Sequence, residues 1–248
     1  MEKPFIIAEV LEKRFISEDV FILRLLQPQI AKECQPGQFV NIKCSHLYDP
    51  LLRRPFSIFD ANEEEISLLI RIIGKGTKSL SLVNKGDKLD ALGPLGNRFP
   101  YEEFKNPLLV AGGMGIAPIH FLLKKIRSPT LVYGAKSRKE LYIIDELENL
   151  CHLHIFTEDG SLGEKGFATI KLASFSQGHD AIFACGPLPM LKEIARIGRE
   201  IDVPTYLSLE ERMACGFGAC LGCAIKTKEG YKMLCKDGPI MKGEEILF

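Results

Sequence analysis

Residues 108–118 decide the fold class of this chain, and they read Leu-Leu-Val-Ala-Gly-Gly-Met-Gly-Ile-Ala-Pro from Leu108 to Pro118. The four apolar residues at the start show no alternation, which is typical of a short strand buried on both faces of a parallel sheet. Three glycines form a turn after it, and Pro118 suits the first turn of a helix that the apolar spacing predicts over 119–126. The order strand, glycine-rich turn, helix predicts an α/β unit.

The same texture recurs along the middle of the chain. Apolar strands are expected at 130–134, 153–156 and 180–187, and the last of them leads into a helix over 190–195. This repetition predicts a parallel α/β sheet with right-handed crossovers, in a nucleotide-binding domain over residues 101–204. In such sheets, ligands bind at the carboxyl ends of the strands.

Two turns at those strand ends are candidates for binding a dinucleotide such as NAD. The glycine-rich turn lets the backbone approach a pyrophosphate, and the helix behind it offers free N–H groups. Its match to Gly-x-Gly-x-x-Gly is incomplete because Pro118 stands at the third glycine, so an ordinary strand-to-helix turn stays open as the alternative. The second turn, at 185–187, has the plainer interpretation of a strand end with a small buried thiol. The candidate residues are Gly112, Gly113, Gly115, Cys185, Gly186 and Pro187.

The first hundred residues have a different pattern, with short strands separated by turns that contain glycine or proline. Strands rich in β-branched and apolar residues are expected at 5–10, 20–26, 39–43, 56–59, 66–73 and 88–92. Strands of this length and spacing predict a small antiparallel β barrel over residues 1–100.

Eight cysteines are too few for a disulfide scaffold, and four of them gather near the C-terminus. Their spacing is Cys215-x4-Cys220-x2-Cys223, with Cys235 after eleven further residues. This is the plant-type [2Fe–2S] spacing, and the small residues between the cysteines allow backbone N–H groups to approach the sulfurs. Zinc bound by four cysteines is the alternative, but it prefers two short pairs, and Cys235 has no close partner. Residues 205–248 are therefore expected to form a small cluster module.

Composition excludes several classes of protein. The 248 residues include 32 basic and 32 acidic side chains, so the chain lacks the net positive charge of a nucleic-acid binder. The longest apolar stretch, 108–123, is too short to span a bilayer, which takes about 20 residues. No apolar signal segment follows Met1, so no membrane partner and a cytoplasmic location are expected.

Two short motifs of the barrel region carry the residue types that a flavin needs. Residues 53–57 read Arg-Arg-Pro-Phe-Ser, and residues 74–77 read Gly-Lys-Gly-Thr. A flavin dinucleotide requires an arginine for its diphosphate, a hydroxyl group beside its ring, and a glycine–threonine turn or helix start for its phosphates. Thr77 is expected near the N-cap of such a helix. An arginine pair on a solvated face is the alternative.

Taken in order, these motifs resemble those of the ferredoxin–NADP reductase superfamily. Residues 54–57 look like its Arg-x-(Tyr/Phe)-Ser flavin motif, residues 74–80 are similar to its Gly-x-x-Ser/Thr-x-x-Leu motif, and the two turns at strand ends look like its nicotinamide motifs. Residues 210–216, Glu-Glu-Arg-Met-Ala-Cys-Gly, resemble the segment that introduces the [2Fe–2S] module in electron-transfer subunits of NAD-dependent (class 1B) dihydroorotate dehydrogenases. The likeness covers essentially the whole chain.

The resemblance implies FAD, a [2Fe–2S] cluster and NAD as cofactors, and it assigns residues by position. The flavin ring and its ribityl–phosphate region are assigned to Arg54, Pro55, Phe56 and Ser57. Backbone contacts to the ring or the adenine side are assigned to Arg71, Ile72 and Ile73, and the diphosphate to Gly76 and Thr77. The cluster ligands are Cys215, Cys220, Cys223 and Cys235. Plain reductases often end in an aromatic residue that covers the flavin, but Phe248 follows the cysteine module and is not given that role.

The resemblance also implies a function in pyrimidine biosynthesis. In the resembled family an FMN-containing catalytic subunit oxidises dihydroorotate, and electrons pass through the cluster and FAD to NAD+. This chain is expected to be the second half, an oxidoreductase subunit in a heterotetramer with two copies of each chain, without activity toward dihydroorotate alone. NAD is expected rather than NADP, because the candidate 2′-phosphate segment, Lys-Ser-Arg-Lys at 136–139, is more simply a solvated helix start.

Two other functions stay open on the sequence. One is the FAD/[2Fe–2S] subunit of another NAD(P)H-linked reductase complex, linked to ferredoxin or sulfide. The other is a regulatory or scaffold protein with a zinc-bound tail. A cluster that hands electrons to another protein must lie near the surface, so its loop is the expected docking face, with Lys226 and Lys228 on it.

Overall fold

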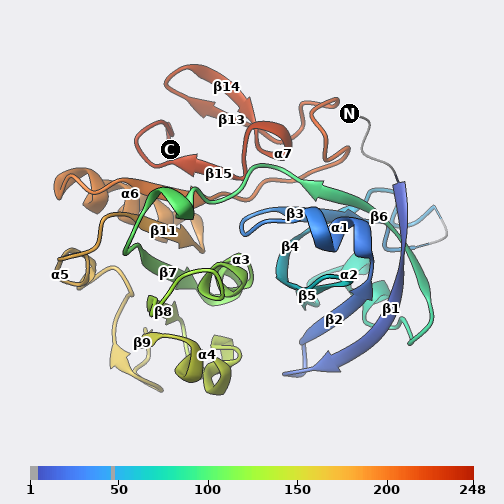
Figure 1. The fold of residues 1–248 in the computed structure, drawn as a ribbon, viewed down its shortest axis with the longest axis horizontal. Helices are drawn as coiled ribbons and strands as arrows, with labels where there is room; N and C mark the ends of the chain where they lie inside the picture. The colour runs from blue at the N-terminus through green and yellow to red at the C-terminus, as the bar shows by residue number, and fades with distance from the viewer. Residues whose placement is uncertain (1–4, 46–47) are drawn as a thin grey trace.

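The computed structural model describes residues 5–45 and 48–248, which form three connected parts. Figure 1 shows a strand barrel on one side, a sheet with helices on the other, and the C-terminal segment lying across the top of both. The predicted fold class is confirmed, with an antiparallel barrel followed by a largely parallel sheet and a small C-terminal module. None of the helices in the described part of the chain is long and apolar enough to cross a membrane.

Within the described residues, six antiparallel strands close into a barrel in the order β1-β2-β5-β4-β3-β6. They are β1 (Phe5–Phe15), β2 (Val20–Leu26), β3 (Phe39–Ile42), β4 (Arg54–Ala61), β5 (Glu65–Arg71) and β6 (Lys88–Leu95). Helix α1 (Pro28–Glu33) follows β2, and helix α2 (Lys75–Leu80) follows β5. Strand β1 is longer than predicted because its first half pairs with β6 and its second half with β2.

Seven of the described strands form the second part, a sheet with the order β10-β9-β8-β7-β11-β12-β15. They are β7 (Leu108–Gly112), β8 (Thr130–Ala135), β9 (His152–Thr157), β10 (Glu164–Lys165), β11 (Ile182–Cys185), β12 (Thr205–Ser208) and β15 (Ile240–Lys242). All neighbours are parallel except β12 and β15. The strand order reverses between β7 and β11, and ligands of open α/β sheets bind at such a switch point.

The described residues between β7 and β12 include four helices and two short 3₁₀ turns. They are η2 (Gly113–Gly115), α3 (Ile116–Leu123), η3 (Arg138–Glu140), α4 (Ile144–Leu150), α5 (Leu172–Phe175) and α6 (Leu188–Glu200), and η1 (Tyr101–Glu103) precedes β7. Helix α3 is the one predicted over 119–126, but it begins earlier because η2 leads directly into it. It also ends earlier than predicted, at Leu123 with Lys124 as its C-cap. Every residue of α3 is buried, since the helix packs between the sheet and β4 of the barrel.

Two strands of the sheet come from residues 205–248, the segment expected to form the cluster module. Strand β12 extends the parallel sheet, and β15 pairs with it so that Ser208 faces Ile240. Between these strands the chain forms the cysteine loop, a hairpin of β13 (Ala224–Thr227) and β14 (Gly230–Met233), and helix α7 (Leu234–Asp237). Both ends of the cysteine-containing segment are therefore held by the sheet.

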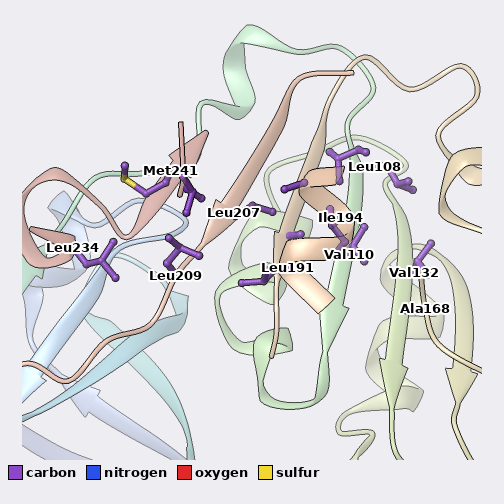
Figure 2. Packing of buried hydrophobic residues seen from close by; sticks show 14 of the residues in the cluster. Leu108, Val110, Val132, Ala168, Leu191, Ile194, Leu207, Leu209, Leu234 and Met241 are labelled. Atoms are coloured by element: carbon purple, nitrogen blue, oxygen red, sulfur yellow. The ribbon is translucent and has the colours of Figure 1, made fainter. Parts of the chain in front are cut away.

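One hydrophobic cluster connects the sheet with this segment. Figure 2 shows a continuous row of side chains that runs from Leu234 of α7 through Leu209 and Met241 to Leu191 of α6. Leu95 of the barrel belongs to the same cluster. Burial of apolar surface stabilises a fold by about 25 cal/mol per Å². Because the three parts share one core, we expect them to stabilise one another.

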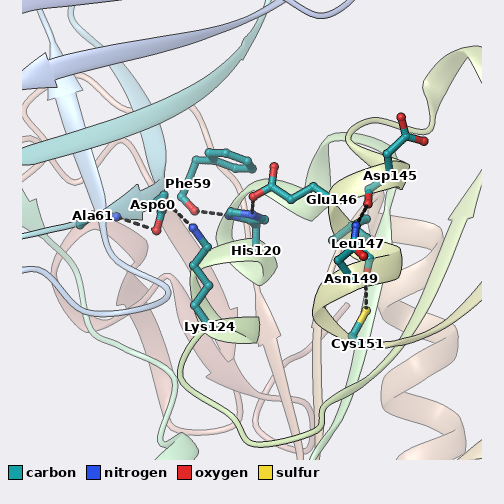
Figure 3. Close-up of polar contacts among 10 residues, drawn as sticks. All are labelled: Phe59, Asp60, Ala61, His120, Lys124, Asp145, Glu146, Leu147, Asn149 and Cys151. Atoms are coloured by element: carbon teal, nitrogen blue, oxygen red, sulfur yellow. Dashed lines mark hydrogen bonds and ion pairs between the residues drawn. The ribbon is translucent and has the colours of Figure 1, made fainter.

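The barrel also meets the sheet through a buried histidine on α3 (Figure 3). His120 Nδ1 lies 3.0 Å from the Phe59 carbonyl oxygen, Nε2 lies 2.8 Å from Glu146 Oε1, and the ring stacks on Phe59 with centroids 4.0 Å apart. A carbonyl and a carboxylate both accept hydrogen bonds, so the imidazole donates to both only when it is protonated. The hydrogen bond from His120 holds the pKa of Glu146 below its usual value. Lys124, on the same helix, pairs with Asp60 of the barrel at 2.5 Å.

Replacing His120 with alanine is expected to destabilise the fold by about 2–4 kcal/mol, because it opens a cavity and leaves the Phe59 carbonyl unpaired. For a chain of this size, that loss lowers the Tm in differential scanning calorimetry by roughly 5–15 °C. Asn149→Ala is the matched control, since the Asn149 side chain donates to the Asp145 carbonyl at the surface of α4. Its Tm should change by about 2 °C at most. Equal shifts in the two variants would contradict the role given to His120.

Candidate functional site

The two turns predicted at strand ends lie against each other at the switch point between β7 and β11. A Cβ atom on Gly115 would lie 2.2 Å from the Cys185 carbonyl oxygen, and one on Gly186 would lie 3.1 Å from Gly112 Cα. A Cβ atom on Gly112 would also lie 2.8 Å from Pro187 Cδ. Only glycine allows two backbones to approach this closely. The structure therefore brings together the two turns that the sequence singled out separately.

A cleft of about 730 Å³ opens at these turns, and we call it the sheet cleft. Among the candidate dinucleotide residues, it is lined by Gly112, Gly113, Gly115, Gly186 and Pro187. The sixth, Cys185, is 2% exposed and lies behind the turn, where burial raises the pKa of its thiol. Ligand pockets usually measure about 300–1,000 Å³, so the sheet cleft has room for a large part of a dinucleotide.

The other walls of the sheet cleft come from distant parts of the chain. Lys136 and Glu140 follow β8, and they line the cleft at the carboxyl end of that strand. Of the candidate 2′-phosphate segment 136–139, only Lys136 is among the lining residues. The opposite wall consists of residues 224–226 of β13 and residues 246–248. Phe248, to which the sequence assigned no role, therefore borders this cleft.

A second cleft of about 250 Å³ lies between the barrel and the start of α3, and we call it the barrel cleft. Among the predicted flavin residues, it is lined by Pro55, Phe56, Ser57, Arg71, Ile73 and Thr77. Met114, Ala117 and Pro118 line it from the sheet side. The two barrel motifs are thus brought together with the glycine-rich turn of the sheet.

Three predicted flavin residues are not among those that line the barrel cleft. The N–H group of Ile72 donates to the Asp19 carbonyl at 2.7 Å, so this amide is already used within the barrel. Arg54 and Gly76 lie together, because a Cβ atom on Gly76 would be 3.2 Å from Arg54 Cγ. Arg54 Nη1 donates to the Leu52 carbonyl at 2.8 Å.

Thr77 lies one turn further into α2 than an N-cap residue would. The helix begins at Lys75 with Gly74 as its N-cap, and Thr77 occupies the third helical position. Its hydroxyl oxygen accepts from the backbone N–H groups of Ile73 at 2.9 Å and Gly74 at 3.2 Å. A side chain at this position in a capping box also bonds back to the N-cap backbone. Thr77 thus closes the turn that lies beside the barrel cleft.

The two clefts share a wall, of which the sequence predicts only Arg71 as a binding residue. The residues that line both clefts are Arg71, Met114, Leu209, Glu210 and Glu211. Residues 209–211 directly follow β12, at the carboxyl end of a sheet strand. The rule that marked the other two turns would have marked these residues too, had β12 been assigned to the sheet.

The shared wall holds an acid and a base in different electrostatic situations. Glu210 borders both clefts and its side chain is exposed there, but the protein atoms around the carboxyl group disfavour its charged form and raise its pKa. Arg71 is paired with Asp19 at 2.8 Å and lies 3.6 Å from Glu140 of η3. The charge of Arg71 is thus compensated by neighbours on both the barrel and the sheet, whereas Glu210 is biased toward its neutral form.

The four clustered cysteines come together two by two. The Cys220 N–H group donates to Cys215 Sγ at 3.4 Å, and the Cys235 N–H group donates to Cys223 Sγ at 3.4 Å. Gly218 N–H also donates to Cys235 Sγ at 3.1 Å, so the cysteine most distant in sequence reaches the loop of the other three. In the part of the chain that the structure describes, no group of three His, Cys, Asp or Glu side chains is placed to hold a single metal ion.

Backbone N–H groups and burial act on these thiols in opposite directions. Burial opposes ionisation of Cys215, but the N–H groups of Cys220, Phe217 and Ala219 outweigh it and lower the pKa of Cys215 to about 6. Burial and the neighbouring Cys223 raise the pKa of Cys235 to about 12. Metals bind thiolates, so N–H groups aimed at the sulfurs favour a bound cluster.

The cysteine loop also contacts the barrel. Asn41 of β3 is fully buried, and its Nδ2 group donates to the Ala214 carbonyl at 3.4 Å. A Cβ atom on Gly216 would lie 2.7 Å from the same Nδ2, while Asn41 Oδ1 has no partner among the described residues. Phe39, two residues earlier in β3, lines the barrel cleft. Because residues two apart in a strand point to the same face, the barrel cleft and the cysteine loop lie side by side along one face of β3.

Two segments of the chain match known family models. Residues 7–101 match the oxidoreductase FAD-binding domain, which spans the barrel. Residues 210–247 match the iron–sulfur cluster binding domain of dihydroorotate dehydrogenase B, which spans the cysteine loop and its hairpin.

Similarity to known proteins extends over the whole chain. Dihydroorotate dehydrogenase B (NAD(+)), electron transfer subunit, of Caldanaerobacter subterraneus subsp. tengcongensis is 40% identical over 97% of this chain and 98% of its own. A protein of Aquifex aeolicus named as a homolog of that subunit is 43% identical, with 97% of each chain covered. A chain in the solved structure of an NADH-dependent reduced ferredoxin-NADP oxidoreductase is 33% identical with a TM-score of 0.86, over 98% of this chain and 91% of that chain.

Gly115→Ala is expected to disrupt the contact between the two turns, because its Cβ would lie 2.2 Å from a carbonyl oxygen of β11 that the sheet holds in place. Overpacking of this kind costs about 1–3 kcal/mol or more, which lowers the Tm by roughly 5–10 °C in calorimetry. Gly74→Ala is the control, since Gly74 has extended backbone and no atom within 4 Å of its would-be Cβ. If both variants have the Tm of the wild-type chain, the close approach of the two turns is not required for stability.

Proposed function

The chain belongs to the electron transfer subunits of the NAD(+)-dependent dihydroorotate dehydrogenase B family, and we propose that it carries electrons from a dihydroorotate-oxidising partner through an iron–sulfur cluster and FAD to NAD+. The observation that carries this proposal is the wall shared by the two clefts. A flavin in the barrel cleft and a nicotinamide in the sheet cleft would meet there, with the cysteine loop beside the barrel cleft on the same face of β3. Because the family oxidises dihydroorotate, the proposed function belongs to pyrimidine biosynthesis.

The barrel cleft is the proposed site of the flavin ring. Pro55, Phe56 and Ser57 supply its apolar walls and one hydroxyl group, and Arg71 and Ile73 border it from β5 and the turn that follows. The FAD diphosphate is assigned to Arg54, Gly76 and Thr77, because an arginine and a glycine-rich helix start lie together next to the cleft. Ile72 contributes no N–H group, since that group is bonded to Asp19. When bound, FAD exchanges a hydride with nicotinamide and single electrons with an iron–sulfur cluster.

The sheet cleft is the proposed site of NAD. Gly112, Gly113, Gly115, Gly186 and Pro187 form its floor, and Cys185 supports the turn from behind. Exposed backbone at a strand-to-helix turn suits the ribose and phosphate groups of a dinucleotide. Glu210 borders the place where the nicotinamide would reach the flavin, and its carboxyl group can hydrogen-bond there.

The cysteine loop is the proposed site of a [2Fe–2S] cluster. A two-iron cluster takes two protein ligands on each iron, and the thiols already lie in two pairs. We assign Cys215 and Cys220 to one iron and Cys223 and Cys235 to the other. The N–H groups that point at the sulfurs would stabilise the negative charge of the cluster.

The proposed partner is an FMN-containing dihydroorotate dehydrogenase catalytic subunit, in a heterotetramer with two copies of each chain. The surface around the cysteine loop supports docking, because Cys220 is exposed and its neighbours Phe217 and Leu221 are 54% and 61% exposed. Aromatic and apolar side chains without charge are typical of interface centres. The cytoplasmic location expected from the sequence stays a prediction.

Cys220→Ser and Cys223→Ser are each expected to remove the cluster, because each deletes one thiolate of a different pair. Iron and acid-labile sulfide per chain should fall sharply, and the electron paramagnetic resonance signal of the reduced cluster should vanish while FAD is retained. Cys151→Ser is the matched control: its thiol donates to the Leu147 carbonyl at 3.2 Å, and burial raises its pKa to about 11. Full iron content in either cluster variant would contradict the ligand assignment.

The function itself is tested by anaerobic titration of the purified chain with NADH and, separately, NADPH. We expect NADH to bleach the flavin absorbance and to produce the reduced [2Fe–2S] resonance signal, with a much weaker response to NADPH. Dihydroorotate should reduce the chain only when the co-expressed catalytic subunit is present. Oxidation of dihydroorotate by the isolated chain, or a response to NADPH alone, would overturn the proposal.

A second candidate function is the corresponding subunit of a ferredoxin-linked NAD(P)H reductase complex. The likeness to a chain of an NADH-dependent reduced ferredoxin-NADP oxidoreductase favours it, at 33% identity over nearly the full length. The partner that co-purifies with the tagged chain separates the two. A second flavoprotein that reduces ferredoxin, in place of a dihydroorotate-oxidising subunit, would establish this alternative.

A further inference from the structure

Two lysines that line the sheet cleft have no charged or polar partner among the described residues. Arg71 is compensated by Asp19 and Glu140. Lys136 and Lys226 line the same cleft, and in the part of the chain that the structure describes their ammonium groups form no ion pair or hydrogen bond. An ammonium group on a cleft wall, without a protein partner, is available to an anionic ligand.

Lys226 lies in the cluster module (residues 205–248), and hydrogen-bonded neighbours hold its backbone on both sides. It pairs with Tyr231 in the β13–β14 hairpin, and its carbonyl accepts the N–H group of Leu247 at 3.1 Å. The next residue, Thr227, is 2% exposed. Because successive side chains of a strand point to opposite faces, the Lys226 side chain points away from the core. It points toward the sheet cleft, which it lines.

The first turn of α6 borders the same part of the cleft. Pro187 and Leu188, which open this helix, are lining residues. The segment bonded to Lys226 reaches α6, because the Lys192 ammonium group lies 5.7 Å from the centre of the Phe248 ring. The start of α6 carries a partial positive charge and the N–H groups of Leu188 and Met190, whereas Pro189 between them has none. Two cationic features from different parts of the fold thus face one end of the cleft.

We propose that Lys226 binds the diphosphate of NAD(H), together with the first turn of α6, an inference that rests on the proposed function. The nicotinamide end of the ligand must lie at the wall shared with the barrel cleft, where the carboxylate of Glu211 would repel phosphate. The diphosphate carries two negative charges, and a hydrogen bond from an ammonium group to such an anion is about twice as strong as a neutral one. The module that carries the cluster therefore also contributes to the nucleotide site. This moves Lys226 from the expected docking face to the sheet cleft.

The test is the affinity of the cofactor-loaded chain for ADP-ribose, which contains the diphosphate but cannot be reduced or oxidised as a nicotinamide. We expect Lys226→Gln to raise the Kd in calorimetry about 10-fold, because one charge-assisted hydrogen bond is lost. Lys226→Arg should stay within a few-fold of the wild-type Kd, since it keeps the charge. Lys228→Gln, on the same hairpin but not on the cleft, is the matched control and should bind ADP-ribose as the wild type does. Raising the salt concentration should weaken binding to the wild type more than to Lys226→Gln.

FAD and iron content, measured on every variant, show that the site is intact. An unchanged Kd for Lys226→Gln overturns the proposal, and so does loss of partner co-purification with unchanged ADP-ribose affinity, which would return Lys226 to the docking face. An equal loss in Lys226→Arg and Lys226→Gln would also overturn it, because charge would then not be the cause. Failure of the wild-type chain to bind ADP-ribose or to be reduced by NADH would instead refute the proposed function.

Discussion

The arrangement of the two clefts depends on the contact between the glycine turns that follow β7 and β11. With no Cβ atoms at Gly112, Gly115 and Gly186, these paired strands can end in turns that touch each other. Helix α3 packs on the barrel, and α6 begins at the rim of the sheet cleft. A bulkier residue at any of the three positions would separate the turns, and the wall shared by the two clefts would be displaced with them.

Much of this architecture follows from local sequence signals. Short apolar or β-branched strands and the turns between them are signals that lie within a few residues, so the barrel and most of the sheet are predictable from the sequence. The sequence does not indicate that β12 belongs to the sheet, because Thr-Tyr-Leu-Ser at 205–208 is short and its neighbours in the sheet come from residues 182–185 and 240–242. Glu210 is not predicted as a binding residue for the same reason, since its position on the shared wall depends on β12 being part of the sheet.

The sequence predicts many of the residues that line the clefts, but it does not predict which distant segments lie next to one another there. Residues 55–57 and the turns at 112–115 and 185–187 line or support the clefts, as their motifs indicate. The sequence contains no signal that Lys226, Asn41 or Phe248 would lie near them, because those contacts join segments far apart in the chain. Side-chain packing between the barrel, the sheet and the cysteine segment decides them, and packing has no short sequence pattern.

The way the cysteine segment is attached has a consequence for the history of such proteins. Ser208 and Ile240 face each other across β12 and β15, and the Leu209 N–H group donates to the Pro239 carbonyl at 3.0 Å. The segment thus leaves and re-enters the fold at one point, between two strands that are already bonded to each other. A tight hairpin turn could join them in its place. An ancestral reductase could therefore acquire or lose an iron–sulfur centre by one insertion or deletion, without altering the path of its chain elsewhere.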